Sequence, residues 1–297
     1  MEERWELARD DEGYPPALLD LPDPPQRLYG LGDAGALSRP CLSVIGARRA
    51  TPYGLAAARL AGRVAAQSDV VVVSGGAMGC DAAAARAALD AGGPTVVVSG
   101  CGADLVYPSS SSDVFARAPR EGGAVVSLEP WGSPPRRYAF PKRNRVIAGL
   151  SRCVFIAEAG ERSGTLGTAL VADQIGRGLY AVPGSIFSPE SAGANQLISE
   201  GAGIICSERD LELRISMDYG ALRLVGEEPS RIEGRLLSAL VGEPLRADDL
   251  ARHLGEPVTG VLCALADYES RGIVERLRDG RYSLSSEAYL TQARMDG

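Results

Sequence analysis

Short runs of consecutive apolar residues recur at near-regular intervals through the first two thirds of the chain. Each run is rich in valine, isoleucine or leucine and is bounded by glycine, proline or polar residues. Because the apolar positions are continuous rather than alternating, both faces of each strand are expected to be covered, as in a parallel sheet between helices. The runs predicted to be strands are 41–46, 69–76, 94–100, 124–127, 153–158, 179–184 and 202–206.

The stretches between these runs predict helices, so strands and helices alternate along the chain. Such alternation is typical of βαβ units and a parallel sheet. The sequence therefore predicts an α/β fold, an extended Rossmann-like, doubly wound and mainly parallel sheet, over residues 41–212. Residues 1–40, rich in Pro, Asp and Glu, predict a reduced and irregular N-terminal extension. Helices are expected at about 52–67, 77–91, 111–118 and 164–176.

The C-terminal part of the chain has a different pattern. Spaced leucines predict two amphipathic helices within 230–254, and a third helix is expected over 257–270. Asp279-Gly280, inside the segment 272–284, is a strong signal for a β-hairpin. Three helices and a hairpin are the pattern of a winged helix. The predicted parts are a linker at 213–229, a winged-helix domain at 230–285 and a tail at 286–297.

Composition and charge exclude several classes of function. The 297 residues are 45% hydrophobic with a net charge of −7, which argues against a surface coated in basic charge for duplex DNA. The one histidine, His253, and six scattered cysteines argue against a metal centre or a histidine-dependent triad. No apolar run could span a membrane, and no secretory signal is visible. We therefore expect a cytoplasmic protein with reduced thiols and no cofactor.

Glycine-rich loops follow several of the predicted strands. The carboxyl ends of parallel strands share one edge, where ligands of open α/β sheets bind, and a loop that opens a helix presents free N–H groups to an anion. No loop has the Gly-x-Gly-x-x-Gly or P-loop pattern, and a tight turn is the alternative interpretation of Gly75 and Gly76. The candidate anion-binding residues are Gly46, Arg48, Gly75, Gly76, Gly102, Ser163, Gly164, Thr165 and Asn195.

Positive charge is concentrated in one stretch, residues 130–152, which holds six Arg or Lys residues and no acid. Trp131 and Tyr138 are interleaved with these charges. Basic groups that neutralise phosphates, next to rings that stack on bases, are typical of sites for single-stranded nucleic acid. The alternative is that the rings are core anchors and the arginines form a solvated face. The candidate residues here are Phe140, Lys142, Arg143, Asn144 and Arg145.

These motifs together resemble one family, DNA-processing protein A, also called DprA or Smf. The resemblance covers the chain from about Tyr14 to Arg209, two thirds of its length. The string of 140–151 is the most specific part of it. The motifs are the Tyr-Pro lead-in at 14–15, Gly-Ala-Arg at 46–48, SGGAMGCDAAA at 74–84, Tyr-Pro at 107–108, FPKRNRVIAGLS at 140–151, Ser-Gly-Thr at 163–165 and Gly-x-Asn-x-Leu-Ile at 193–198.

The resemblance implies an extended Rossmann fold without catalytic activity. It implies a homodimer that binds and protects incoming single-stranded DNA and loads the recombinase RecA during natural transformation. The C-terminal segment resembles a winged helix found in many members, but 229–297 has nine arginines against eleven acids, so we expect it to contact protein or to regulate. The DNA contacts implied are Arg48, Phe140, Lys142, Arg143, Arg145, Ser163, Gly164, Thr165 and Asn195.

Glu158 keeps a second class of function open. It ends a predicted strand, where a catalytic carboxylate of a nucleotide-binding or nucleotide-hydrolysing Rossmann enzyme of the phosphoribohydrolase type would lie. No paired acid or metal ligand is nearby, so an ion pair with Arg143 or Arg145 is the preferred interpretation. The Pro-Gly-Gly-x-Gly-Thr-x-x-Glu string of those hydrolases is also absent, because no glutamate follows Ser163-Gly164-Thr165 at the required spacing.

Overall fold

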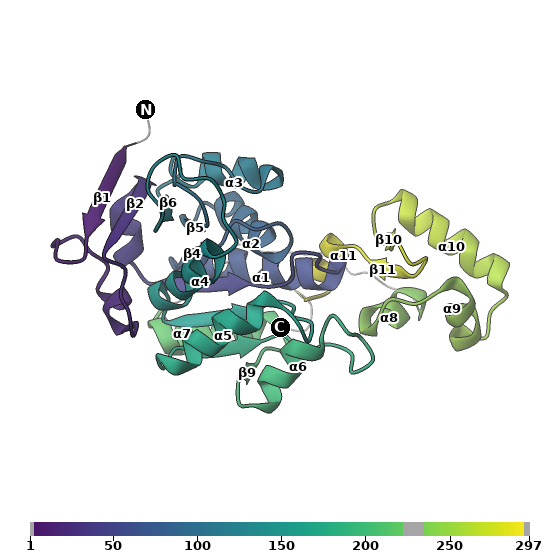
Figure 1. The fold of residues 1–297 in the computed structure, drawn as a ribbon. Helices are drawn as coiled ribbons and strands as arrows, with labels where there is room; N and C mark the ends of the chain where they lie inside the picture. The colour runs from purple at the N-terminus through teal and green to yellow at the C-terminus, as the bar shows by residue number, and fades with distance from the viewer. Residues whose placement is uncertain (1–2, 222–234, 294–297) are drawn as a thin grey trace.

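A nine-stranded sheet organises the chain in the computed structural model, which describes residues 3–221 and 235–293 (Figure 1). The strand order is β1-β2-β6-β5-β4-β3-β7-β8-β9, and every neighbouring pair from β6 to β9 is parallel. All seven strands expected from the apolar runs are present. The strands are β1 (Arg4–Ala8), β2 (Arg27–Gly32), β3 (Cys41–Ile45), β4 (Val71–Ser74), β5 (Thr95–Ser99), β6 (Ala124–Ser127), β7 (Cys153–Ile156), β8 (Gly178–Ala181) and β9 (Gly203–Ile204).

Helices cover both faces of the sheet, as the continuous apolar strands require. In β3, Leu42 and Val44 pack with α1, α2 and α7, whereas Cys41 and Ile45 pack with α4, α5 and α6. The prediction of an extended Rossmann-like, mainly parallel sheet is therefore confirmed. The helices are α1 (Pro52–Gln67), α2 (Cys80–Asp90), α3 (Ser112–Arg117), α4 (Ala139–Leu150), α5 (Gly164–Gln174), α6 (Ala192–Ser199) and α7 (Glu208–Tyr219), with 3-10 turns η1 (Pro16–Asp20), η2 (Ala34–Ser38) and η3 (Ser109–Ser111).

The order in which the chain adds strands to the sheet reverses between β3 and β7, although these two strands run parallel. From β3 the chain adds β4, β5 and β6 on one side, and it then crosses back to add β7, β8 and β9 on the other side. In open α/β sheets, ligands bind beyond the carboxyl ends of the strands at such a switch point. The topology therefore places a binding site at the ends of β3, β4 and β7.

Residues 3–40 contain two paired strands and two 3-10 turns, so the expectation of an irregular N-terminal segment was wrong. β1 and β2 form an antiparallel hairpin that extends the sheet, and β2 pairs antiparallel with β6. The indole of Trp5 lies across Gly30, where a Cβ would be 2.1 Å from the ring, and its N–H donates to the carbonyl of Gly32 at 2.8 Å. Leu18 and Leu21 are buried against Gly149 of α4. The segment therefore supports the helix that carries the basic cluster.

The segment expected as a linker, 213–229, is helical in its first part. α7 continues to Tyr219 and ends at Gly220, which has the left-handed φ of 65° typical of a helix stop. Residues 222–229 of the expected linker lie outside the described residues. The linker boundary predicted at residue 213 was therefore too early.

The C-terminal elements follow the predicted order of three helices and a hairpin. β10 and β11 pair antiparallel around the turn at Asp279-Gly280. The assignment of this unit as a winged helix, and its boundaries, stay predictions. Its elements are α8 (Arg235–Gly242), α9 (Ala247–Leu254), α10 (Val258–Ser270), β10 (Val274–Arg276), β11 (Tyr282–Leu284) and α11 (Ser286–Ala293).

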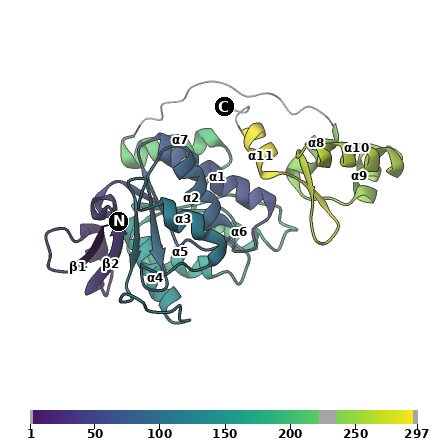
Figure 2. The same cartoon turned by 90° about the horizontal axis from the view of Figure 1, so that it is seen from above.

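Within the segment predicted as a tail, Ser286–Ala293 form α11, which lies against α1 of the large sheet domain (Figure 2). The rings of Tyr53 and Tyr289 meet edge to face, with centroids 5.3 Å apart. Arg59 donates to the hydroxyl of Ser286 at 2.6 Å and also pairs with Glu287. This contact joins the C-terminal unit to the sheet domain.

Close packing of α1 on α2 gives a first test. A Cβ at Gly62 would lie 2.1 Å from the carbonyl oxygen of Ala84, whereas one at Gly167 in α5 would meet nothing within 4 Å. We expect Gly62→Ala to lower the free energy of unfolding by about 1–3 kcal/mol through overpacking. Gly167→Ala should raise it by up to about 1 kcal/mol through helix propensity. Urea unfolding measures both, and equal effects of the two variants would contradict this packing.

Candidate nucleic-acid interface

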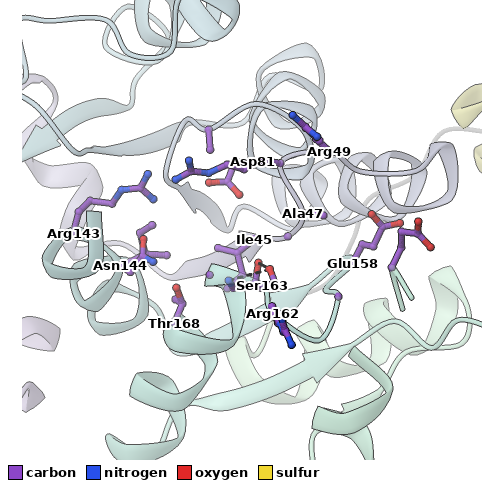
Figure 3. Close-up of a pocket in the computed structure, with 18 of the residues that line it drawn as sticks. Ile45, Ala47, Arg49, Asp81, Arg143, Asn144, Glu158, Arg162, Ser163 and Thr168 are labelled. Atoms are coloured by element: carbon purple, nitrogen blue, oxygen red, sulfur yellow. Dashed lines mark hydrogen bonds between the residues drawn. The ribbon is translucent and has the colours of Figure 1, made fainter. Parts of the chain in front are cut away.

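A cavity of about 570 Å³ opens at the switch point (Figure 3). Its walls come from the loops after β3, β4 and β7 and from α4 and α5. Four arginines line it, against three carboxylates. The lining residues that bear polar or charged side chains are Arg48, Arg49, Asp81, Arg143, Asn144, Glu158, Arg162, Ser163, Thr165, Thr168 and Glu190.

The loop after β3 brings two arginines to the mouth of the cavity. Gly46 allows this loop to pass close to α2, because a Cβ there would lie 2.6 Å from the sulfur of Cys80. Arg48 and Arg49 follow at once, and both are exposed. Thr51 then caps α1 by accepting from the N–H of Gly54 at 3.1 Å. The loop is therefore short, fixed at both ends and positively charged.

Glu158 holds this loop in place. Its backbone carbonyl accepts from the N–H of Ala47 at 2.9 Å, and its carboxylate accepts from the N–H of Thr51 at 3.0 Å and from the Thr51 hydroxyl. Burial raises the pKa of this carboxyl, and the hydrogen bonds from Thr51 oppose that rise. The expected ion pair with Arg143 or Arg145 was wrong, because the acceptor atoms of Glu158 serve the 46–51 loop.

The buried cation of the site is Arg143, and the charge that acts on it most strongly is that of Asp81. Arg143 is only 5% exposed, and Figure 3 shows its side chain directed toward Asp81. Burial lowers the pKa of Arg143 to about 10, and the negative charge of Asp81 opposes this shift. Burial likewise raises the pKa of Asp81, which accepts a hydrogen bond from Gly75 N–H at 2.9 Å. The two charges therefore compensate each other inside the wall.

Gly75 has a structural reason to be glycine. A Cβ at this position would lie 1.6 Å from Nη1 of Arg143, so the guanidinium occupies the space beside the backbone. The Nε atom of Arg143 is buried and has no hydrogen-bond partner among the described residues. The glycine loop after β4 thus accommodates a charged side chain of the protein itself. Gly75 and Gly76 are not part of the cavity lining.

The ring of Phe140 supports two of the arginines. It lies over Gly100, where a Cβ would be 2.6 Å from Cε1, and it is half-buried. The guanidinium carbons of Arg48 and Arg143 are 5.6 and 5.9 Å from its centroid. A cation over an aromatic face is held by the ring quadrupole. Phe140 therefore orients Arg48 and Arg143, and its predicted stacking on a base stays a prediction.

The N-terminus of α5 forms the opposite wall. Ser163 caps the helix by accepting from the N–H of Thr165 at 3.2 Å, and Gly164 has open space where a Cβ would be. The first N–H groups of a helix lack intrahelical partners and carry partial positive charge. This wall can therefore bind an anion next to the arginines.

The structure brings half of the predicted site residues together. Lys142 is exposed on α4 and lies 5.3 Å from the ring of Tyr138, outside the cavity. Arg145 is turned toward Asp23, at 3.9 Å. The side chain of Asn195 is used by the backbone of Gly184, at 3.1 and 3.0 Å. Gly46, Arg48, Arg143, Asn144, Ser163, Gly164 and Thr165 line the cavity, whereas Gly75, Gly76, Gly102, Phe140, Lys142, Arg145 and Asn195 do not.

Four charged residues of the cavity, Arg49, Asp81, Arg162 and Glu190, were not singled out from the sequence. Arg49 follows Arg48, and Arg162 precedes the cap of α5, so both are adjacent to predicted residues. Asp81 follows the glycine loop, where an acid in the first turn of a helix resembles an ordinary dipole contact. Arg143, whose charge acts on Asp81, lies far along the chain, so the local pattern around Asp81 did not reveal this interaction.

Two absences limit what the site can do. Within residues 3–221 and 235–293, no three His, Cys, Asp or Glu side chains are grouped so that they could hold a metal ion. In the same residues, no helix combines the length and the apolar character needed to cross a membrane.

The fold and the cavity define a Rossmann-like protein with a cationic site at its switch point. The family model described as DNA recombination-mediator protein A matches residues 6–215. The chain therefore belongs to this family, and the resemblance noted from its motifs is confirmed. The matched residues include every element that lines the cavity.

Individual relatives agree with this assignment. Protein Smf of Escherichia coli is 34% identical over 283 residues, which cover 92% of this chain and 76% of that protein. The crystal structure of DNA processing protein A from Streptococcus pneumoniae aligns with a TM-score of 0.65 at 36% identity, over 70% of this chain and 73% of that one. The Helicobacter pylori protein, whose structure is described as revealing a single-stranded DNA binding mode, aligns with a TM-score of 0.65 at 31% identity, over 73% and 100%.

The buried pair gives a second test. Asp81→Ala leaves the cation of Arg143 uncompensated, so we expect it to lower the free energy of unfolding by about 3–5 kcal/mol. Asp81→Ala combined with Arg143→Met removes both charges and should recover part of that loss. Urea unfolding of wild type, single variants and double variant measures the coupling. Additive losses in the double variant would show that the two charges do not compensate each other.

Proposed function

We propose that this protein binds single-stranded DNA by holding backbone phosphates in the cavity at the switch point. The observation that carries this proposal is the position of Arg48, across the cavity from the N-terminus of α5 and over the ring that also supports Arg143. An arginine fork and free N–H groups are both good partners for phosphate oxygens. The cavity presents them together at its mouth.

The surroundings of the cavity favour a single strand over a duplex. Tyr138 is 51% exposed and Tyr107 is 45% exposed, and the ring of Tyr107 lies 5.8 Å from that of Phe140. Exposed rings beside a cationic site stack on unpaired bases, which a duplex does not offer. Lys142, beside Tyr138, extends the positive surface. The Helicobacter pylori relative, described by its single-stranded DNA binding mode, supports the same choice.

The finer role follows from the family. We propose that the protein is a recombination mediator that protects incoming single-stranded DNA, loads RecA during DNA uptake, and does so as a cytoplasmic homodimer. The description of the family as DNA recombination-mediator protein A supports the mediator role. The C-terminal unit, predicted to be a winged helix, would contact protein or regulate rather than read duplex DNA.

We propose no catalytic step for Glu158. Its carboxylate accepts two hydrogen bonds from Thr51, and its carbonyl fixes Ala47, so it positions the arginine loop. A nucleotide hydrolase would need this carboxylate to reach the substrate. Steady release of a base or sugar from a nucleotide, abolished by Glu158→Gln, would overturn the binding proposal in favour of the phosphoribohydrolase type.

A salt series tests the proposal. If about five phosphates are neutralised, log K for oligo-dT should fall with log salt at a slope near −3.5, at about 0.7 per phosphate on single strands. Arg48→Ala combined with Lys142→Ala should flatten this slope by about 1.4, because each variant removes one phosphate contact. Fluorescence anisotropy measures both, and Arg209→Ala, an exposed arginine on α7, is the matched control. A slope unchanged in the double variant would contradict the site.

A further inference from the structure

A second cavity, of about 560 Å³, begins where the first one ends. The two cavities share Arg48 and Arg49, so these residues form the boundary between them. The second cavity continues over the outer surface of α1 and α2. Its lining residues are Arg48, Arg49, Ala50, Leu55, Arg59, Gly79, Ala83, Arg86, Ala87, Asp90 and Glu287.

The shape of this groove follows from the residues of α2. Gly79, Ala83 and Ala87 are spaced by four, so they lie on one face of the helix and leave room above it. Leu55 and Arg59, also spaced by four, form the facing wall from α1. From Gly79 to Asp90 the groove is about 16 Å long, at 1.5 Å per residue. A few nucleotides of an extended strand fit such a length.

The charges of the groove favour an anion. For Arg48 and Arg49 the structure gives no ion pair within the described residues, so their charges face the solvent. The carboxylate of Asp90 is neutralised by Arg117 at 2.7 Å. Arg86 is held in a fork by Asp113 from α3, at 2.6 and 2.7 Å. The groove therefore keeps a positive balance at the end that meets the first cavity.

Glu287 is the one acid that the C-terminal unit contributes to the groove. It lies on α11 and pairs with Arg59. This ion pair competes with the binding of another anion to Arg59. The side chain of Glu287 is 72% exposed and that of Arg59 is 34% exposed. Solvent-screened ion pairs contribute about 0–1 kcal/mol, so this pair opposes the exchange of the carboxylate for another anion only weakly.

We propose that the groove between α1 and α2 is a second subsite for the sugar-phosphate backbone of single-stranded DNA, and that Glu287 competes with phosphate for Arg59 there. The proposal rests on the proposed function of the first cavity and extends it. A strand that leaves the first cavity passes over Arg48 and Arg49 into the groove. The C-terminal unit then lowers affinity for long strands only, because a short strand ends before Arg59.

The test compares two lengths of oligo-dT on the full chain. A strand of a few nucleotides fills the first cavity, and one of about twenty also reaches the groove. We expect Arg59→Ala to weaken binding of the long strand about threefold and to flatten its salt slope by about 0.7, with the short strand unaffected. Glu287→Gln should strengthen binding of the long strand about threefold, because one phosphate gains Arg59. Fluorescence anisotropy in a salt series reads both.

Matched controls separate the groove from general charge effects. Glu269→Gln removes an exposed acid of α10, and Arg209→Ala removes an exposed arginine of α7; neither lines the groove. The groove proposal is overturned if Arg59→Ala matches Arg209→Ala, or if Glu287→Gln matches Glu269→Gln, on the long strand. In that case the short strand still binds through Arg48. Failure of the first-cavity proposal looks different, because the short strand then does not bind or is insensitive to Arg48→Ala.

Discussion

The compensation of Arg143 by Asp81 inside the sheet edge is the constraint on which the rest of the site depends. Because both groups are buried, each charge offsets part of the cost of burying the other, and the loop after β4 has a glycine where the guanidinium passes. The same guanidinium lies near one ring, Phe140, which also orients Arg48. Asp81, Arg143 and Phe140 therefore connect α2, α4 and the loop of residues 46–51 into one wall of the cavity.

The topology of the sheet places this wall beside a cavity. The order of strand addition reverses between β3 and β7, so the loops after these strands lead to opposite sides and leave a cavity between them. Glu158, just beyond the end of β7, fixes the loop that follows β3 through Ala47 and Thr51, and α5 contributes its N-terminus opposite. The whole chain has a net charge of −7, so the four arginines that line the cavity are a local concentration of positive charge.

The sequence was sufficient where local chemistry decides the structure. Continuous apolar runs identified the seven core strands, and Thr51-Pro52 marked the start of α1. β1 was missed because Arg4 and Glu6, two of its five residues, are exposed and charged at the sheet edge. α4 was not among the expected helices, because Pro141 and the basic residues weaken the helical pattern, although proline is tolerated in a first turn. Glu158 interacts with Thr51 and Asp81 with Arg143, residues far apart in the sequence, so no local pattern could reveal these interactions.

The central claim is that backbone phosphates of single-stranded DNA occupy the cavity between the arginine loop and α5. A crystal structure of the protein with a short oligo-dT tests it most directly. The account predicts a phosphate oxygen within hydrogen-bond distance of the Arg48 guanidinium and of the Gly164 N–H. It also predicts that Arg143 keeps its position beside Asp81, because its role is to build the wall. An oligonucleotide bound on another face, with the cavity empty, would contradict the account.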